Sequence, residues 1–127
     1  MKIAAVFLLL STLALADVAR IEPAAAAKLI TEGKAVLVDV REPAEWAESG
    51  VATPAILLAK SDFDAGGVQW QTFLAGVGDK QIIVYCRTGR RSEAVAGALA
   101  KKGFKVLNAG GFDAWQRAEL PVRKVGR

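Results

Sequence analysis

The stretch QIIVYCRTGRRSEAVAGALAKKG, residues 81–103, contains the only cysteine of the 127-residue chain. Residues 82–85 are apolar, β-branched or aromatic, which is typical of a strand buried on both faces in a parallel sheet. From Ser92 onward the chain is rich in alanine, with valine and leucine, and Gly103 suits the left-handed position after a helix. The sequence therefore predicts a strand, a loop that begins at Cys86, and a helix.

The loop after the cysteine, RTGRR at residues 87–91, is strongly cationic and lies at the expected start of the helix. The helix macrodipole is positive at that end, so each arginine there costs about 0.3 to 1 kcal/mol at an exposed site. An anion would offset this repulsion, because the free backbone N–H groups of the first helical turn and the guanidinium groups all favour one. The two candidate anions are the Cys86 thiolate and a charged substrate that faces it.

The same cationic surroundings are expected to lower the pKa of the Cys86 thiol from about 8.5 into the range of about 3.5 to 7.5 known for cysteines beside such groups. The thiolate is the form of the side chain that acts as a nucleophile. The alternative is an inert core residue, since free cysteine is among the most buried residue types. We favour the reactive thiol, because an inert one gives no reason for three neighbouring arginines.

Apolar and β-branched runs predict further strands along the chain, with helical segments between them. The other expected strands are a short edge strand at 18–21 and strands at 35–40, 54–59 and 104–107. The other expected helices lie at 23–32, 43–50 and 112–117, with a connection containing one amphipathic piece at 61–78 and a tight turn at 108–111. This alternation predicts one α/β domain with an open, mainly parallel sheet covered on both faces. Cys86 then falls at the carboxyl ends of the strands, where such sheets bind ligands.

Asp39 and Arg41 lie two residues apart at the end of the strand predicted at 35–40. They are close enough in sequence to pair with each other or to brace a neighbouring loop. We expect a structural ion pair at the carboxyl edge of the sheet, because carboxylates near arginines are more often structural than catalytic. A direct catalytic role is the less favoured alternative.

The N-terminal segment differs in character from the rest of the chain. A basic start precedes an apolar stretch at residues 3–15, and residues 14–16 form a small-x-small cleavage site. This pattern predicts a secretory signal peptide at 1–16 and a mature domain at 17–127, so we expect a periplasmic or otherwise exported protein. The apolar stretch is short for a spanning helix, which needs about 20 residues, so no stable membrane insertion is expected after cleavage. An uncleaved signal anchor is the alternative.

Composition argues against several classes of chemistry. With one cysteine the chain has no internal disulfide and no resolving thiol for dithiol redox chemistry. With no histidine it has neither a Cys–His pair nor the commonest metal ligand. The formal net charge is only +4, and the basic residues of the loop and of the C-terminus are not interleaved with aromatic residues. No nucleic-acid partner is therefore expected.

Three separated motifs occur in the order and at the spacing of a known family. They are LVDVREP at 37–43 with Glu45, Trp46 and Gly50; VYCRTGRRS at 84–92; and GF at 103–104 with GGF at 110–112, Trp115 and LPV at 120–122. Together they resemble the rhodanese (thiosulfate sulfurtransferase) family in its single-domain form, over residues 21–122. The resemblance implies a five-stranded parallel sheet with helices on both sides. It also implies that Cys86 lies at the floor of a cradle built from the backbone N–H groups of residues 87–91.

The resemblance implies a reaction as well as a fold. The Cys86 thiolate would attack the outer sulfur of thiosulfate or a related anionic donor, sulfite would leave, and a persulfide would remain on the cysteine. A thiophilic acceptor, cyanide in an assay or a thiol in the cell, would then remove that sulfur. The residues implied to bind the substrate, the arginines by attracting the anion and the other two by shaping the loop, are Arg87, Thr88, Gly89, Arg90 and Arg91. No metal and no organic cofactor are implied.

Two alternative functions stay open. Cys-dependent phosphatases and arsenate reductases use a similar loop with five residues between the cysteine and the arginine, whereas Arg91 follows Cys86 after only four. A non-catalytic or protein-specific sulfur carrier would keep the same thiol and fold, since function belongs to the site. The chain also has GVATPA at residues 50–55, where many family members have Gly-His-Ile followed by Gly-Ala. This departure leaves the identity of the substrate open.

Overall fold

The structure, a computed structural model, describes residues 18–126, and the predicted signal peptide at 1–16 lies outside the described residues. The helices of the described part are α1 (Pro23–Thr31), α2 (Pro43–Ser49), α3 (Lys60–Asp64), α4 (Val68–Gly76), α5 (Arg90–Lys101) and α6 (Phe112–Arg117). Its strands are β1 (Ala35–Asp39), β2 (Val51–Ala52), β3 (Ala55–Leu57), β4 (Gln81–Cys86), β5 (Val106–Gly111) and β6 (Val122–Arg123). No helix within residues 18–126 is long and apolar enough to cross a membrane.

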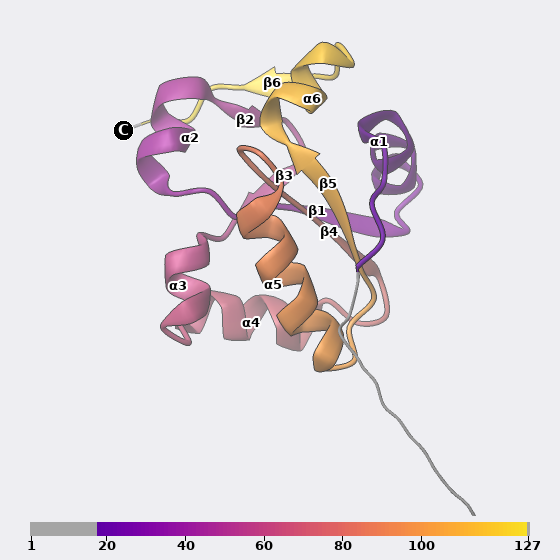
Figure 1. Ribbon diagram of the computed structural model, residues 1–127, viewed down its shortest axis with the longest axis vertical. Helices are drawn as coiled ribbons and strands as arrows, with labels where there is room; N and C mark the ends of the chain where they lie inside the picture. The colour runs from indigo at the N-terminus through magenta and orange to yellow at the C-terminus, as the bar shows by residue number, and fades with distance from the viewer. Residues whose placement is uncertain (1–17, 127) are drawn as a thin grey trace, which may run out of the picture.

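The main sheet has the strand order β3-β1-β4-β5, and every neighbouring pair is parallel. β2 and β6 form a separate two-stranded antiparallel sheet. The predicted α/β class, with a mainly parallel sheet between helices, is confirmed (Figure 1). The edge strand expected at 18–21 is reduced to a single parallel bridge between Arg20 and Asn108, so the main sheet of the described residues has four strands instead of five. The chain leaves the sheet at this point because Pro23, with its φ preset for a helix, begins α1.

The central strands bury both of their faces, because successive side chains of a strand point to opposite sides of the sheet. Val38, Val84 and Cys86 belong to the core cluster that packs against α3, α4 and α5. Leu37 and Ile83 belong to the cluster on the other face, which α1 and α6 cover (Figure 1). The continuous apolar runs seen in the sequence follow from this two-sided burial. Cys86 therefore lies on the face covered by α5.

The prediction of a tight turn at residues 108–111 is wrong, since these residues are the last four of β5. Gly111 pairs with Cys86 across a register irregularity between β4 and β5. Two features keep the segment in the sheet. The side-chain amide of Asn108 is buried in hydrogen bonds, and Gly110 takes a φ of 84°, which glycine adopts without steric cost. Paired glycines are typical of turns, and here tertiary contacts override that preference.

The connection predicted at 61–78 contains two helices, α3 and α4, where we expected a single amphipathic piece. α4 buries Trp70, which is 2% exposed, so the aromatic residues of this segment belong to the core as predicted. α3 is short and polar, and an ion pair between Lys60 and Asp64 (2.7 Å) joins its ends. Such a helix has no periodic apolar stripe, so its sequence pattern does not distinguish it from a loop.

Candidate active site

The sulfur of Cys86 is surrounded by hydrogen-bond donors at the carboxyl end of β4. The chain turns sharply after this strand because Gly89 adopts a φ of 101°, and α5 begins at the next residue, Arg90, earlier than the Ser92 expected from sequence. This turn places the backbone N–H of Gly89 3.0 Å from Cys86 Sγ and the N–H of Ser92 3.4 Å from it. The Ser92 hydroxyl lies 3.3 Å from the same sulfur. Because Cys86 is 0% exposed, these donors replace solvent around the sulfur.

The donors favour the anionic form of the sulfur. Burial by itself raises the pKa of Cys86, but hydrogen bonds from the Ser92 hydroxyl and from the backbone N–H groups of Ser92, Gly89 and Thr88 outweigh it and hold the pKa below that of an ordinary thiol. The direction agrees with the expectation from sequence. The cause differs, because the largest favourable contributions come from neutral donors and not from arginine charges. The loop therefore stabilises a thiolate mainly through the neutral hydrogen-bond donors that its conformation places around the sulfur.

The three arginines of the loop have different surroundings. Arg91 donates two hydrogen bonds to the Glu45 carboxylate on α2, at 2.7 and 2.9 Å. This fork lowers the pKa of Glu45 to about 2 in spite of its partial burial, so the pair is charged at neutral pH. Arg87 and Arg90 are exposed, and of these two only Arg87 lines the pocket next to the loop. Arg91 thus ties the loop to α2, whereas Arg87 faces the space where a ligand can enter.

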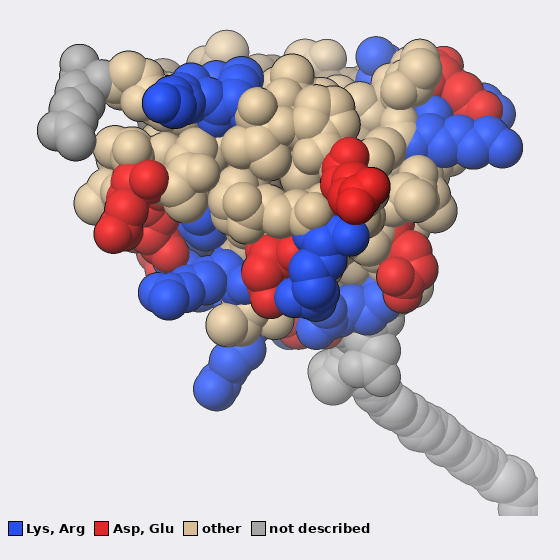
Figure 2. All heavy atoms as spheres, turned by 90° about the horizontal axis from the view of Figure 1, so that it is seen from above, with Lys and Arg blue, Asp and Glu red and all other residues tan. Residues whose placement is uncertain are grey.

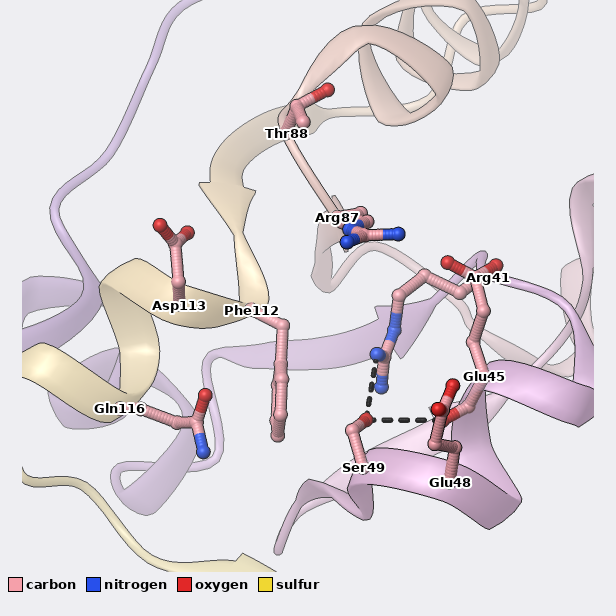
Figure 3. Close-up of a pocket in the computed structure, with 9 residues that line it drawn as sticks. All are labelled: Arg41, Glu45, Glu48, Ser49, Arg87, Thr88, Phe112, Asp113 and Gln116. Carbon is pink, nitrogen blue, oxygen red and sulfur yellow. Dashed lines mark hydrogen bonds between the residues drawn. The ribbon is translucent and has the colours of Figure 1, made fainter.

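An open pocket of about 480 Å³ lies between the loop and helices α2 and α6 (Figure 3). Its lining residues are Arg41, Glu45, Glu48, Ser49, Arg87, Thr88, Phe112, Asp113 and Gln116. The Arg87 side chain extends from the loop toward Arg41 (Figure 3), so two guanidinium groups contribute to one wall of the pocket. Within residues 18–126 no cluster of three or more His, Cys, Asp or Glu side chains is placed to hold a metal ion.

The charges around the pocket are mixed. On the side of the molecule that carries α2 and α6, acidic and basic side chains lie next to one another around an uncharged centre (Figure 2). Asp113 at the pocket edge pairs with Arg117 at 2.7 Å, and Glu45 pairs with Arg91. Carboxylates at the edge are thus largely matched by neighbouring cations. Arg87 has no such salt bridge among the described residues, which leaves its charge available to an anionic ligand.

The predicted ion pair between Asp39 and Arg41 is confirmed and fixes one wall of the pocket. Arg41 Nε and Nη2 donate to the two carboxylate oxygens of Asp39 at 2.9 to 3.1 Å, and both residues are almost fully buried. The same guanidinium donates to Ser49 Oγ (2.9 Å) and to the Gly50 carbonyl oxygen (2.8 Å). It also lies 4.4 Å from the centre of the Phe112 ring. Arg41 therefore braces α2 and α6 as well as facing the pocket.

A buried polar network behind the loop was not predicted from sequence. Ser92 Oγ lies 2.8 Å from Asn108 Oδ1 on β5, and both residues are 0% exposed. Asn108 Nδ2 donates to the carbonyl oxygen of Gly89 (3.1 Å) and to Glu93 Oε1 (3.0 Å). A buried polar residue is tolerated only where its hydrogen bonds are satisfied, and those of Asn108 are. No signal in the sequence indicated this role, because Asn108 begins the tight turn predicted at 108–111, where asparagine is typical.

Comparison with protein families identifies the family of the chain. A family model for the rhodanese-like domain matches residues 22–118, which contain all four strands of the main sheet and the whole loop after Cys86. The chain belongs to the rhodanese-like domain family. The family resemblance inferred from the three sequence motifs is thereby confirmed.

Three solved structures of related proteins are similar to this chain over most of the length of both chains. A rhodanese-related protein from Thermoplasma volcanium is 26% identical, with a TM-score of 0.68, and the match covers 83% of this chain and 97% of that one. A polysulfide-sulfur transferase homodimer from Wolinella succinogenes is 26% identical, with a TM-score of 0.68 and coverage of 87% and 82%. A rhodanese from E. coli, solved with anions, is 25% identical, with a TM-score of 0.57 and coverage of 72% and 99%.

Gly111→Ala should displace the loop of this rhodanese-like domain. A Cβ atom at position 111 would overlap the carbonyl oxygen of Arg87 and lie 3.1 Å from its carbonyl carbon, and these backbone atoms move only with the loop. We expect a loss of about 1 to 3 kcal/mol in the free energy of unfolding, the cost of overpacking. We also expect a higher pKa of Cys86, because its N–H donors would shift. Denaturant unfolding and the pH dependence of thiol alkylation measure the two effects.

Gly97→Ala is the matched control. It lies in α5, and a Cβ atom there meets nothing within 4 Å, so alanine should stabilise the helix by about 0.8 to 1 kcal/mol. If Gly111→Ala were as well tolerated as Gly97→Ala, the close approach of β5 to the loop would not matter.

Proposed function

We propose that the protein is a sulfurtransferase that moves sulfane sulfur from thiosulfate, or a related anionic donor, to a thiophilic acceptor such as cyanide or a thiol. The observation that carries this proposal is the position of Cys86 Sγ, which accepts hydrogen bonds from the N–H groups of Gly89 and Ser92 and from the Ser92 hydroxyl. Such an arrangement favours a negative charge on sulfur without a general base. Membership of the rhodanese-like family and the similarity to a polysulfide-sulfur transferase support the same chemistry.

The proposed reaction has two covalent steps. The Cys86 thiolate attacks the outer sulfur of the donor, the S–S bond of thiosulfate breaks, and sulfite leaves with the bonding electron pair. The product is a Cys86 persulfide, whose terminal sulfur carries the negative charge. Cyanide or an acceptor thiolate then attacks that terminal sulfur, forms thiocyanate or a new persulfide, and releases the Cys86 thiolate. The backbone N–H groups of the loop hold the negative charge throughout.

The loop residues have distinct proposed roles. Gly89 supplies the left-handed turn and one of the N–H donors, and Thr88 forms part of the pocket wall. Arg87 attracts the donor anion and faces the departing sulfite. Arg91, which is engaged by Glu45, positions the loop. Arg90 is exposed and contributes a more distant positive charge.

Formation of thiocyanate from thiosulfate and cyanide by the purified mature protein is the direct test of this function. Turnover that depends on both substrates would support a thiosulfate sulfurtransferase. Absence of turnover with thiosulfate and with polysulfide would count against the proposal.

Arg87→Ala should impair the use of anionic donors in particular. A charge-assisted hydrogen bond contributes about 1.5 to 3 kcal/mol, so we expect kcat/KM for thiosulfate to fall about 10- to 100-fold. The rate at which Cys86 is modified by a neutral alkyl thiosulfonate, which forms a mixed disulfide and releases a sulfinate, should change much less, because that reagent has no charge for the guanidinium to bind. Steady-state kinetics with thiosulfate and the second-order rate of this single modification give the comparison.

Arg90→Ala is the control for the loss of one positive charge from the same loop, because Arg90 is exposed and does not line the pocket. It should lower kcat/KM for thiosulfate only slightly. Equal losses for the two variants, or an equal effect of Arg87→Ala on thiosulfate turnover and on modification by the neutral thiosulfonate, would contradict a direct contact between Arg87 and the anion.

A protein-specific sulfur carrier is a second candidate, and the complete burial of Cys86 favours it. Cys86 does not line the pocket, so a donor can reach the sulfur only if neighbouring residues move, and a docking protein could drive that movement. Turnover with free thiosulfate and cyanide separates the two functions. A persulfide that forms but passes its sulfur only to a protein would identify a carrier.

We also propose that residues 1–16 direct export of the domain. The support is the basic start, the apolar stretch at 3–15 and the small residues at the predicted cleavage site. N-terminal sequencing of the protein recovered from the periplasmic or extracellular fraction should begin at Asp17. A product that retains Met1 and stays in the cytoplasm would contradict this proposal.

A further inference from the structure

The hydroxyl group of Ser92 lies between two acceptors. Its Oγ is 2.8 Å from Asn108 Oδ1 and 3.3 Å from Cys86 Sγ. A serine hydroxyl has a single hydrogen to donate, together with lone pairs that accept. It can therefore donate to Asn108 or to the sulfur, but not fully to both at once.

The orientation of the Asn108 amide is fixed by its other partners. The backbone N–H of Gly110 donates to Oδ1 at 3.0 Å, and only the oxygen can accept that bond. Nδ2 faces the carbonyl oxygen of Gly89 and Glu93 Oε1, which are both acceptors. The oxygen of Asn108 must therefore point toward Ser92. Because both residues are fully buried, solvent does not compete for the hydroxyl.

Each form of the sulfur suits one orientation of the hydroxyl. When Cys86 is a neutral thiol, the hydroxyl donates to Asn108 and turns a lone pair toward the S–H group. When the sulfur is an anion, the hydroxyl can donate to it. Asn108 Oδ1 then still accepts the Gly110 N–H, so the rotation leaves no buried acceptor without a partner. Both orientations are thus open to the folded protein at low cost.

We propose that Asn108 is a positioning residue for Cys86: it competes with the sulfur for the Ser92 hydroxyl and so limits how strongly that hydroxyl stabilises the anion. The significance for catalysis rests on the proposed sulfur transfer. A thiolate that is held too tightly is a weaker nucleophile, since nucleophilicity falls as thiol pKa falls. Asn108 would keep the Cys86 thiolate from being stabilised too strongly, and would release the hydroxyl when negative charge develops on the cysteine sulfur.

The charged groups around Cys86 are the same in either orientation. They are Arg91 on α5 with its partner Glu45 on α2, Arg87 in the loop, Glu93 on α5, which Asn108 contacts, and Arg20, whose guanidinium lies beside Gly89 and Gly110. A variant of Asn108 also loses the contacts to Glu93 and Gly89. The experiment must therefore separate the effect of losing these contacts from the effect that Asn108 has on Cys86 through the Ser92 hydroxyl. A double-mutant cycle with Ser92→Ala does so.

The test is a titration of Cys86 in four proteins: wild type, Asn108→Leu, Ser92→Ala and the double variant. The thiolate is followed by its ultraviolet absorbance and by the pH dependence of iodoacetamide alkylation. Asn108→Leu should lower the pKa by about 0.4 to 1 unit, because the hydroxyl is then free to donate to the sulfur at all times. Ser92→Ala should raise the pKa, and adding Asn108→Leu to it should change nothing further.

A downward shift that persists in the Ser92→Ala background would overturn the proposal, since it would act through Glu93 or Gly89. An unchanged or raised pKa in Asn108→Leu would also overturn it. If Asn108→Leu does not fold, as judged by circular dichroism, Asn108→Ala removes the same oxygen and takes its place in the cycle. The titration uses no sulfur donor, so the expected shifts together with absent sulfur transfer would refute the proposed function and leave the role of Asn108 intact.

Discussion

Cys86→Ser should abolish sulfur transfer while leaving the fold intact. The serine oxygen can accept the N–H groups of Gly89 and Ser92 in place of sulfur, so the loop keeps its hydrogen bonds. An alcohol does not ionise near neutral pH and cannot form a persulfide, so we expect activity to fall by at least about 10³-fold, as when a catalytic nucleophile is removed. Thiocyanate formation measures the activity, and circular dichroism with denaturant unfolding checks the fold.

The control combines Cys86→Ser with Ala25→Cys. Ala25 is an exposed residue of α1, so this variant has one thiol, as the natural chain does, but exposed to water and outside the loop. It should be as inactive as Cys86→Ser. Activity that returns with the relocated thiol would mean that any thiol suffices and that the cradle has no catalytic role.

Asp39→Asn should cause the largest loss of stability among single substitutions near the pocket. It leaves the guanidinium of Arg41, which is 3% exposed, buried without a counter-charge. Breaking a buried ion pair on one side costs about 3 to 5 kcal/mol, a large part of the roughly 5 to 15 kcal/mol that holds a typical domain folded. Denaturant unfolding should show this loss. The pocket wall formed by Arg41 should loosen with it.

Asp113→Asn makes the same chemical change in an exposed ion pair. The side chains of Arg117 and Asp113 are 70% and 66% exposed, and such pairs contribute about 0 to 1 kcal/mol. Its unfolding free energy should therefore stay close to that of the wild type. Similar small effects of Asp39→Asn and Asp113→Asn would contradict the structural role assigned to the buried pair.

The fold was predictable where local pattern and tertiary environment agree. The apolar runs of β1 and β4 identify strands buried on both faces, and proline and glycine mark both ends of α2. The prediction failed at residues 108–111, where Gly110 and Gly111 signal a turn but stay in β5. The reason is a contact distant in sequence, because the loop after Cys86 packs against Gly111. No local pattern contains that information.

The position of the candidate site was predictable from the sequence, whereas the hydrogen bonds and ion pairs within it were less so. The single cysteine before a cationic loop identifies the reactive position, and the lowered pKa of Cys86 follows from helix geometry in general terms. The sequence could not reveal that Glu45 forms a salt bridge with Arg91, since the two residues are far apart along the chain. It also could not reveal that Asn108 reaches Ser92, because this contact depends on the register of β5 against β4. From the loop sequence alone, the contribution of the arginine charges to the lowered pKa of Cys86 is overestimated, and the contribution of the Ser92 hydroxyl is missed.

The most direct test of the account is the intact mass of the purified mature protein after incubation with thiosulfate and again after addition of cyanide. We predict a gain of one sulfur atom, about 32 Da, which is located at Cys86, absent in Cys86→Ser, and removed by cyanide as thiocyanate. A protein that gains no sulfur from thiosulfate or polysulfide, or that gains it equally in Cys86→Ser, would contradict the persulfide mechanism.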